Sequence, residues 1–360
     1  MRLSALLTAL IALSSSTSSQ AIQFPTPENP QARALLDRTQ MDAAKLSAML
    51  GFAKPAAQDW PCAPPLSELY QVAGIAGALP EDQLAPKVKA QMDESKRMMR
   101  KALRSSGMDP AMAPVSTFSN IELIPVKAQC VDGKLDGPVE YYLSFTSKMT
   151  STMEQMSTLT NKVETNRNLM TDTVQMLIQR TYQAGEPQPG VRSIRRGSIV
   201  SHMTFENPAM QKMMDDSLSK TGSLNRASPS SSITFGAQDG VVAFTLNEEP
   251  KVTGGIFGIN TAWTTKLGTM VMLTGAKVNN TYMYSDAQPL NVSRRNTETS
   301  TTESVTFMEN YVKKMGKKLA DMPNMENYRE VVMGGKDMLE MRSCMVDNKP
   351  VKLDPCPVEE

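Results

Sequence analysis

Apolar residues recur at helical spacing through the first third of the chain. The residues that carry this pattern are Leu36, Ala43, Leu46 and Leu50. Their steps of three, four and seven residues are typical of one face of an α-helix. The dipeptide Asn29-Pro30 precedes them, and it supplies a capping residue followed by a proline in the first turn. We therefore expect residues 22–112 to be mainly helical.

Residues 113–302 alternate between two patterns. The stretches 139–145 and 233–284 are rich in β-branched and aromatic residues between turn signals, which favours antiparallel strands. Between them, apolar residues step by three or four from Met149 to Leu177, with one turn skipped at Asn166. This spacing predicts one long amphipathic helix over residues 148–180, although its many threonines favour strands.

The last segment, residues 303–360, is expected to be a helix followed by a tail. Val305, Met308, Val312 and Met315 step by three and four residues, and Pro323 ends the helical pattern. The sequence as a whole predicts an α+β protein. It would have a helical N-terminal part, a mainly antiparallel β region and long amphipathic helices packed beside it.

The first 21 residues have the order of a secretory signal peptide. Arg2 is followed by an apolar run from Leu3 to Leu13, and then by small and polar residues up to Ala21. This run is about half of the roughly twenty residues that span a bilayer, so we expect it to be cleaved. No later segment is a candidate span, and the mature protein is expected to be periplasmic or secreted.

The charge balance excludes one class of partner. The chain has 38 Lys and Arg residues against 37 Asp and Glu residues. Removing Arg2 with the signal leaves 37 of each, which is a net charge of zero. A nucleic-acid-binding protein normally has a clear basic excess, so we expect no nucleic acid partner.

Four cysteines predict two disulfides in an exported chain. They are Cys62, Cys130, Cys344 and Cys356. Four cysteines allow three pairings. We favour Cys344 with Cys356, because closing a short loop costs less entropy, and this leaves Cys62 with Cys130. The spacing of the cysteines matches neither a redox motif nor a zinc site.

One short segment has a local likeness to a known repeat. Residues 130–142 read CVDGKLDGPVEYY, and this segment resembles one unit of a MORN-type repeat. The resemblance implies a short hairpin. MORN proteins carry several such units in tandem, whereas this unit stands alone here.

Catalytic motifs are scarce in this sequence. His202 is the single histidine, and no nucleophile elbow, Walker loop or dinucleotide fingerprint occurs. A pair of catalytic carboxylates leaves no spacing signature, so a carboxylate-dependent envelope hydrolase stays an alternative. The basic stretch 87–104 fits either a solvated helix face or contact with anionic lipid or glycan surfaces.

Methionine is unusually abundant, with 28 residues. Met149, Met153 and Met156 would share one face of the predicted helix, and thioethers are ligands that suit Cu(I). A Cu(I)-binding periplasmic protein is therefore one alternative, with these three as candidate ligands and no other cofactor expected. The same residues also suit core packing or an adaptable protein-binding surface.

The composition and motifs together favour a non-catalytic role. We expect an exported binding or interaction protein of the cell envelope or extracellular space, which associates with a protein partner or with itself. The Cu(I)-binding protein and the envelope hydrolase are the alternatives from other classes.

Overall fold

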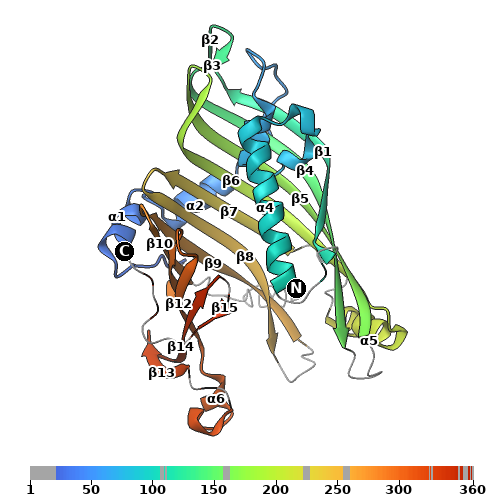
Figure 1. The fold of residues 1–360 in the computed structure, drawn as a ribbon, viewed down its shortest axis with the longest axis vertical. Coiled ribbons are helices and arrows are strands. Elements are labelled where there is room, and N and C mark those ends of the chain that lie inside the picture. The colour runs from blue at the N-terminus through green and yellow to red at the C-terminus, as the bar shows by residue number, and fades with distance from the viewer. Residues whose placement is uncertain are drawn as a thin grey trace, which may run out of the picture.

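The protein is built around one large, strongly curved antiparallel sheet (Figure 1). A computed structural model describes residues 22–105, 109, 112–156, 163–221, 228–253, 260–323, 325, 327–347, 349–351, 356 and 358. The predicted signal peptide, residues 1–21, lies outside this range.

Helices occupy mainly the first part of the described chain. They are α1 (Pro30–Asp37), α2 (Ala43–Leu50), α3 (Leu66–Val72), α4 (Pro86–Ser105), α5 (Pro208–Thr221) and α6 (Tyr311–Lys314), with 3-10 turns η1 (Ala76–Ala78), η2 (Glu81–Gln83) and η4 (Leu319–Asp321). The Asn29 side chain accepts hydrogen bonds from the backbone N–H groups of Gln31 and Ala32, so α1 begins with the cap that its sequence predicts.

Strands make up most of the remainder. The first seven are β1 (Val115–Lys127), β2 (Cys130–Val131), β3 (Lys134–Leu135), β4 (Gly137–Met156), β5 (Val163–Gln183), β6 (Glu186–Thr204) and β7 (Ser228–Ala237). The others are β8 (Gly240–Thr253), β9 (Asn260–Thr274), β10 (Val278–Ser285), β11 (Gln288–Asn296), β12 (Thr301–Glu309), β13 (Tyr328–Met333), β14 (Lys336–Val346) and β15 (Lys349–Pro350).

The strand order follows the chain with few exceptions. The large sheet runs β1-β4-β5-β6-β7-β8-β9-β10-β11-β12-β14-β13, and β15 pairs with β14. Every pairing in it is antiparallel. The short strands β2 and β3 form a separate hairpin, which is the structure that the MORN-like segment implies.

The predicted fold class is wrong. The protein is mostly a large antiparallel sheet, with 51% strand and 23% helix, and not a helical N-terminal part with long amphipathic helices beside a smaller β region. The predicted helix over 148–180 is replaced by β4 and β5, which pair along their full length. The helix expected from Val305 is replaced by β12 and the four-residue α6.

The physical reason lies in the polarity of these strands. A half-buried strand normally alternates between apolar and polar residues, and this alternation is the signal that identifies it. In β4 and β5, serine, threonine and asparagine occur on both faces, so the alternation is weak. The three- and four-residue steps of methionine are coincidental, and the β-branched threonines decide the structure.

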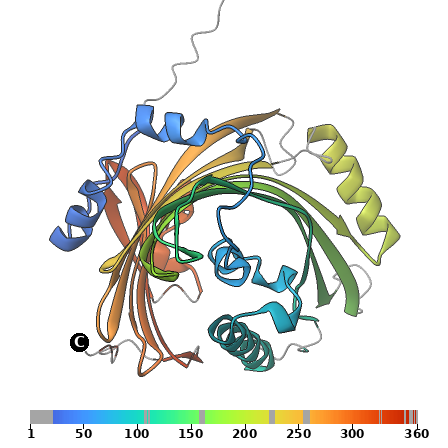
Figure 2. The ribbon, with the colours of Figure 1, turned by 90° about the horizontal axis from the view of Figure 1, so that it is seen from above.

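Two helices cover the convex face of the sheet. Figure 2 shows α1 and α2 outside the curve. The buried residues of this core are Ala32, Leu35, Leu36, Leu46, Ile194, Ile233, Val242, Phe244, Leu267, Val271 and Leu273. The backbone at Gly240 permits the close approach of α1, because an added Cβ there would lie 2.7 Å from Leu35 Cδ2 and 2.1 Å from the Met272 carbonyl oxygen.

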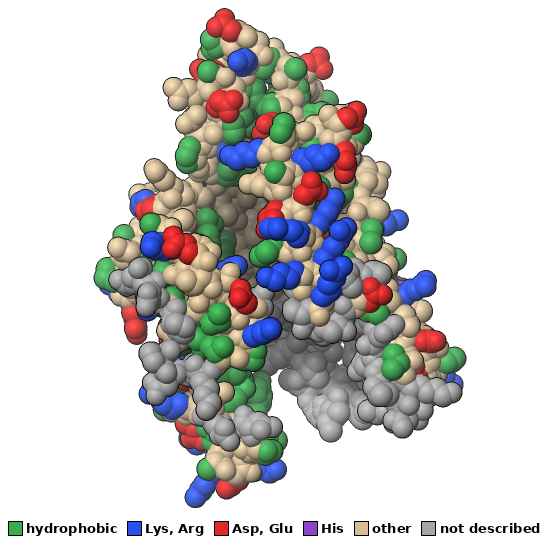
Figure 3. All heavy atoms as spheres, in the orientation of Figure 1, with side chains coloured by type: hydrophobic (Ala, Val, Ile, Leu, Met, Phe, Trp, Pro, Cys, Tyr) green, Lys and Arg blue, Asp and Glu red, His purple; other side chains and the backbone are tan. Residues whose placement is uncertain are grey.

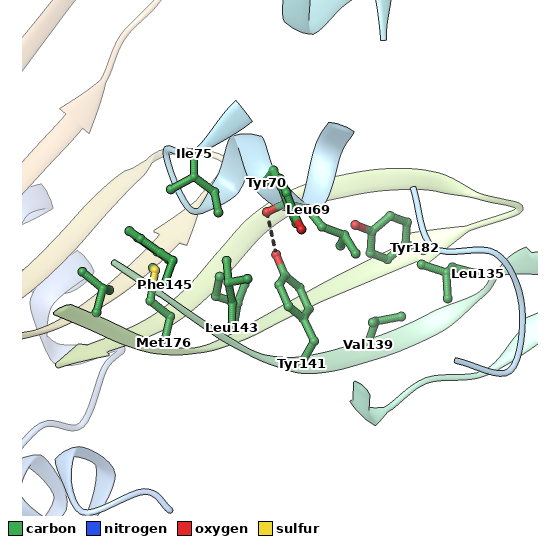
Figure 4. Close-up of a cluster of buried hydrophobic side chains, with 12 residues drawn as sticks. Leu69, Tyr70, Ile75, Leu135, Val139, Tyr141, Leu143, Phe145, Met176 and Tyr182 are labelled. Atoms are coloured by element: carbon green, nitrogen blue, oxygen red, sulfur yellow. Dashed lines mark hydrogen bonds between the residues drawn. The ribbon is translucent and has the colours of Figure 1, made fainter. Parts of the chain in front are cut away.

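A second core lies on the concave face, under α3. Figure 4 shows side chains of β4 and β5 pointing toward α3 and the turn that follows it. Tyr141, Leu143 and Phe145 of β4 pack there with Leu69 and Ile75. The Tyr141 hydroxyl donates a hydrogen bond to the Leu69 carbonyl oxygen at 3.3 Å. This contact fixes α3 inside the curve (Figure 2).

Two disulfides tie loops to this framework. They join Cys62 to Cys130 and Cys344 to Cys356, which is the pairing that the sequence favoured. The first links the segment before α3 to the β2–β3 hairpin. In the part of the chain that the structure describes, no helix has the length and apolar character needed to cross a membrane.

Candidate functional site

The register of the strands assigns each side chain to one face of the sheet. Residues directly opposite each other on neighbouring strands point to the same face. Leu143 of β4 lies under α3, on the concave face, and it pairs with Met176. Met176 pairs with Arg195 of β6, which pairs with Ser232 of β7. The same steps extend the assignment across β8 to β10.

Methionines gather on the concave face. Six of them, which we call the methionine face, are Met149, Met170, Met203, Met270, Met272 and Met283. Met149 is paired directly with Met170, and Met270 with Met283. Their cross-strand neighbours are mainly small or polar. The register continues the same face to Met308, Met341 and Met345 of β12 and β14.

The two faces of the sheet carry different apolar side chains. Between β6 and β9, the branched and aromatic residues Ile194, Phe244 and Val271 are buried on the convex face against α1 and α2. The methionine face, in contrast, is only half-buried, and Met283 is 39% exposed. A core would leave these thioethers inaccessible, so this part of the concave face is a surface rather than a packed interior.

Beside the methionines, β5 carries a row of hydrogen-bond acceptors without partners. The side-chain oxygens Oδ1 of Asn166, Asn168 and Asp172 are buried and accept no hydrogen bond within the described structure. We call these three residues the acceptor row. They occupy alternate positions of β5, so all three lie on the concave face with Met170 between them. Asn166 is only 6% exposed.

A buried acceptor without a hydrogen bond lowers the stability of the fold. A buried polar group without a hydrogen bond loses about 1–3 kcal/mol relative to one that is paired. Most such groups in native proteins are paired with protein or with ordered water. Three such oxygens lie on one strand, next to half-exposed methionines, and no protein group of the described structure donates a hydrogen bond to them.

Asp172, the last residue of the acceptor row, also forms an ion pair. Arg195 of β6 donates to Asp172 of β5, and the two side chains are 26% and 19% exposed. Gly197 leaves room for them, since an added Cβ there would lie 2.9 Å from both Arg195 Nη1 and Asp172 Oδ1. The pair therefore covers the sheet at Gly197 and places one charged group of each sign on the concave face.

One tyrosine at the far end of β5 is also perturbed. Burial raises the pKa of the Tyr182 hydroxyl to about 12, although nearby Arg180 lowers this pKa in part. The hydroxyl has no hydrogen-bond partner. Tyr182 belongs to the core under α3, so its hydroxyl stays protonated at neutral pH and supports packing rather than acid–base chemistry.

The helix α4 lies across the open side of the curve, in front of the concave face in Figure 1 and between the two ends of the sheet in Figure 2. Its N-terminal half is anchored by Val88, which is buried, and by Met92, whose Cε would lie 3.7 Å from a Cβ added at Gly77. A cleft of about 850 Å³ separates α4 from α3 and η1.

The predicted copper ligands do not share one face of a helix. They belong to the strand β4 instead, where Met149 lies on the concave face opposite Met170. The side chains of Met153 and Met156 lie outside the description, so the metal site itself stays a prediction. His202 lies exposed on the convex face of β6.

Sequence reasoning missed most of the methionine face and all of the acceptor row. The signal was present, because Met270 and Met272 alternate with Val271 and Leu273. Read at a period of two, this segment places methionine on one face and branched residues on the other. The acceptor row also repeats every two residues. The sequence does not show that its three oxygens lack partners, because this follows only from the pairing of the strands.

The described residues include no group of three or more His, Cys, Asp or Glu side chains able to hold a metal ion. No protein family, no curated protein and no solved structure matches the chain.

The ion pair leads to a testable prediction. Replacing Arg195 by Met leaves the Asp172 carboxylate partly buried and unpaired, which should lower the free energy of unfolding by about 1–3 kcal/mol. The double variant R195M/D172N also removes the unpaired carboxylate charge, so it should recover most of the lost free energy of unfolding. Urea unfolding of the purified protein measures both changes.

Arg38→Met is the matched control. It breaks the ion pair between Arg38 and Asp239, whose side chains are 55% and 56% exposed. Exposed pairs contribute about 0–1 kcal/mol, so this variant should stay close to the unmodified protein. Equal losses for R38M and R195M would show that the concave pair is as solvated as a surface pair.

Proposed function

We propose that this protein is an exported, non-catalytic binding protein that holds its ligand on the concave face of the sheet. The ligand class we assign is a flexible, largely apolar molecule that also carries hydroxyl or amine groups. Its apolar part would contact the methionine face. Its donors would pair with the acceptor row, whose oxygens are buried in the free protein and would become accessible on binding.

The observation that carries this proposal is the separation of side chains between the two faces. Branched and aromatic residues form the core on the convex face, while the thioethers on the concave face are half-exposed. Methionine side chains are unbranched and polarisable, so they adapt to ligands of different shape. Serine and threonine neighbours keep this surface from being uniformly apolar. The predicted signal peptide and the two disulfides support a location outside the cytoplasm.

A titration followed at the methionine methyl groups tests the proposal. The protein would be labelled with ¹³C at the methionine methyls and titrated with 1-decanoylglycerol, which has a flexible chain and two hydroxyls, below its micelle concentration. We expect methyl shifts to change for Met170, Met270, Met272 and Met283. The exposed residues Met213 and Met315, which lie outside the concave face, should not move.

Paired variants make the result specific. M270Q/M283Q replaces two thioethers by amides of similar length and should weaken binding at least tenfold, because roughly 1 kcal/mol of apolar contact is lost at each position. M213Q/M315Q is the control and should bind normally. Equal shifts at Met213 and the methionine face, or equal binding by both variants, would contradict the proposal.

A second candidate function is Cu(I) binding. The observation in its favour is that Met149 and Met170 lie directly opposite each other on β4 and β5, so two thioethers are adjacent on the half-exposed face. Thioethers are soft ligands that suit Cu(I). A protein partner or self-association, expected from the sequence, also stays a prediction. The hydrolase alternative gains nothing from the acceptor row, because its one carboxylate, Asp172, is paired with Arg195.

Competition with a Cu(I) chelator in the presence of reductant tests this candidate. One bound Cu(I) per chain is expected, and M149L/M170L should abolish the binding while M213L/M315L preserves it. Leucine keeps the apolar volume, so the first variant should still bind 1-decanoylglycerol. No retention of Cu(I) at micromolar metal would contradict the copper function without affecting the apolar-ligand proposal.

A further inference from the structure

Positive charge is concentrated on α4. The helix carries seven basic residues, which are Lys87, Lys89, Lys96, Arg97, Arg100, Lys101 and Arg104, against the two acidic residues Asp93 and Glu94. Its net charge is therefore +5, whereas the whole chain has a net charge of +1. The rest of the chain carries −4, so the charge of this helix is a local feature that the total conceals.

Little of this charge is neutralised. Lys89 pairs with Glu81 at 3.2 Å, and Arg97 pairs with Glu94 at 2.6 Å. Among the residues that the structure describes, Lys96, Arg100, Lys101 and Arg104 have no ion-pair partner. With Arg97 these four line a cleft of about 700 Å³ along the helix, to which Glu81 and Asp93 also contribute. We call the five residues the basic stripe.

The helix is amphipathic, and its apolar side is only partly covered. At about 100° per residue, Val88, Met92, Met99 and Leu103 fall within about 60° of one another, and the basic stripe spans about 140° next to them, with Met98 beyond its other edge. Val88 is buried, but Met98 and Met99 are 49% and 48% exposed. The C-terminal half of α4 thus offers apolar side chains beside the charges.

The basic stripe faces away from the sheet. Figure 3 shows Lys and Arg side chains gathered along α4 on the face turned toward the viewer, which is the open side of the curve. The structure places no part of the described chain in front of them. A large flat or extended anion can therefore approach this helix without a rearrangement of the fold.

We propose that α4 docks the protein onto an anionic lipid bilayer. A basic helix with exposed apolar residues at its edge binds the interface of a membrane by combining electrostatic attraction to anionic headgroups with shallow apolar insertion. Met98 and Met99 favour a bilayer over a purely polar polyanion, because a hydrated polymer offers no apolar phase for them. Docking through α4 would turn the open side of the sheet toward the membrane.

Vesicle binding by the full mature protein tests this inference. Flotation with phosphatidylcholine vesicles containing 30 mol% phosphatidylglycerol should recover the protein, and pure phosphatidylcholine vesicles should not. Binding should fall steeply when NaCl rises from 0.1 to 0.5 M, since salt screens the attraction. M98Q/M99Q should weaken binding several-fold at constant charge, because it removes the apolar contact.

A charge-matched pair of variants separates the helix from general electrostatics. K96Q/R100Q/K101Q/R104Q removes four charges from α4, and K313Q/K314Q/K317Q/K318Q removes four from the exposed segment at α6. Each basic residue near an anionic surface contributes roughly fivefold in affinity, so the α4 variant should bind at least fiftyfold more weakly. The α6 variant should keep its binding to within about threefold. Circular dichroism and thermal unfolding verify that both are folded.

Three outcomes would overturn the inference. Equal weakening by both variants would assign binding to net charge rather than to α4. Undiminished binding by the α4 variant, or binding to neutral vesicles as tight as to anionic ones, would exclude the helix as the docking element. Retention of a sulfated polysaccharide with no recovery on anionic vesicles would identify a polymer as the partner. None of these results bears on 1-decanoylglycerol binding at the methionine face.

Discussion

The packing of α1 and α2 on the convex face of the sheet is the interaction on which the rest of the structure depends. It buries the branched and aromatic side chains of the central strands, each of which stabilises the fold by about 1.5–3 kcal/mol. Because these strands gain their stability from one face, the other face is free to carry residues that pack poorly. The concave face therefore carries methionine, serine and threonine side chains.

The opposite arrangement holds at the first strands of the sheet. There α3 lies inside the curve and covers β4 and β5 with a core built on Tyr141, Leu143 and Phe145. The concave face is thus closed under α3 and uncovered along the methionine face, with α4 across the open side. The two proposals use different parts of this arrangement, since ligand binding rests on the uncovered strands and membrane docking rests on the outward side of α4.

Short sequence features predicted a helix start and a disulfide pairing correctly, but they did not predict the fold. Asn29-Pro30 identified the start of α1, and loop length indicated the pairing of Cys344 with Cys356. The two long strands β4 and β5 were taken for a helix, because their faces differ little in polarity and methionine favours helices. What reveals them is pairing with strands far along the chain, which no local window contains.

Oxidation by dilute hydrogen peroxide measures whether the methionine face is an uncovered surface opposite the core. Mass spectrometry would give the rate of sulfoxide formation at each methionine. The buried Met176, which lies on the same face of the sheet under α3, is the internal reference. If the face is uncovered, Met270, Met272 and Met283 should oxidise at least tenfold faster than Met176, and 1-decanoylglycerol should slow their oxidation. Oxidation of these three as slowly as Met176 in the free protein would show instead that the face is packed and cannot bind a ligand.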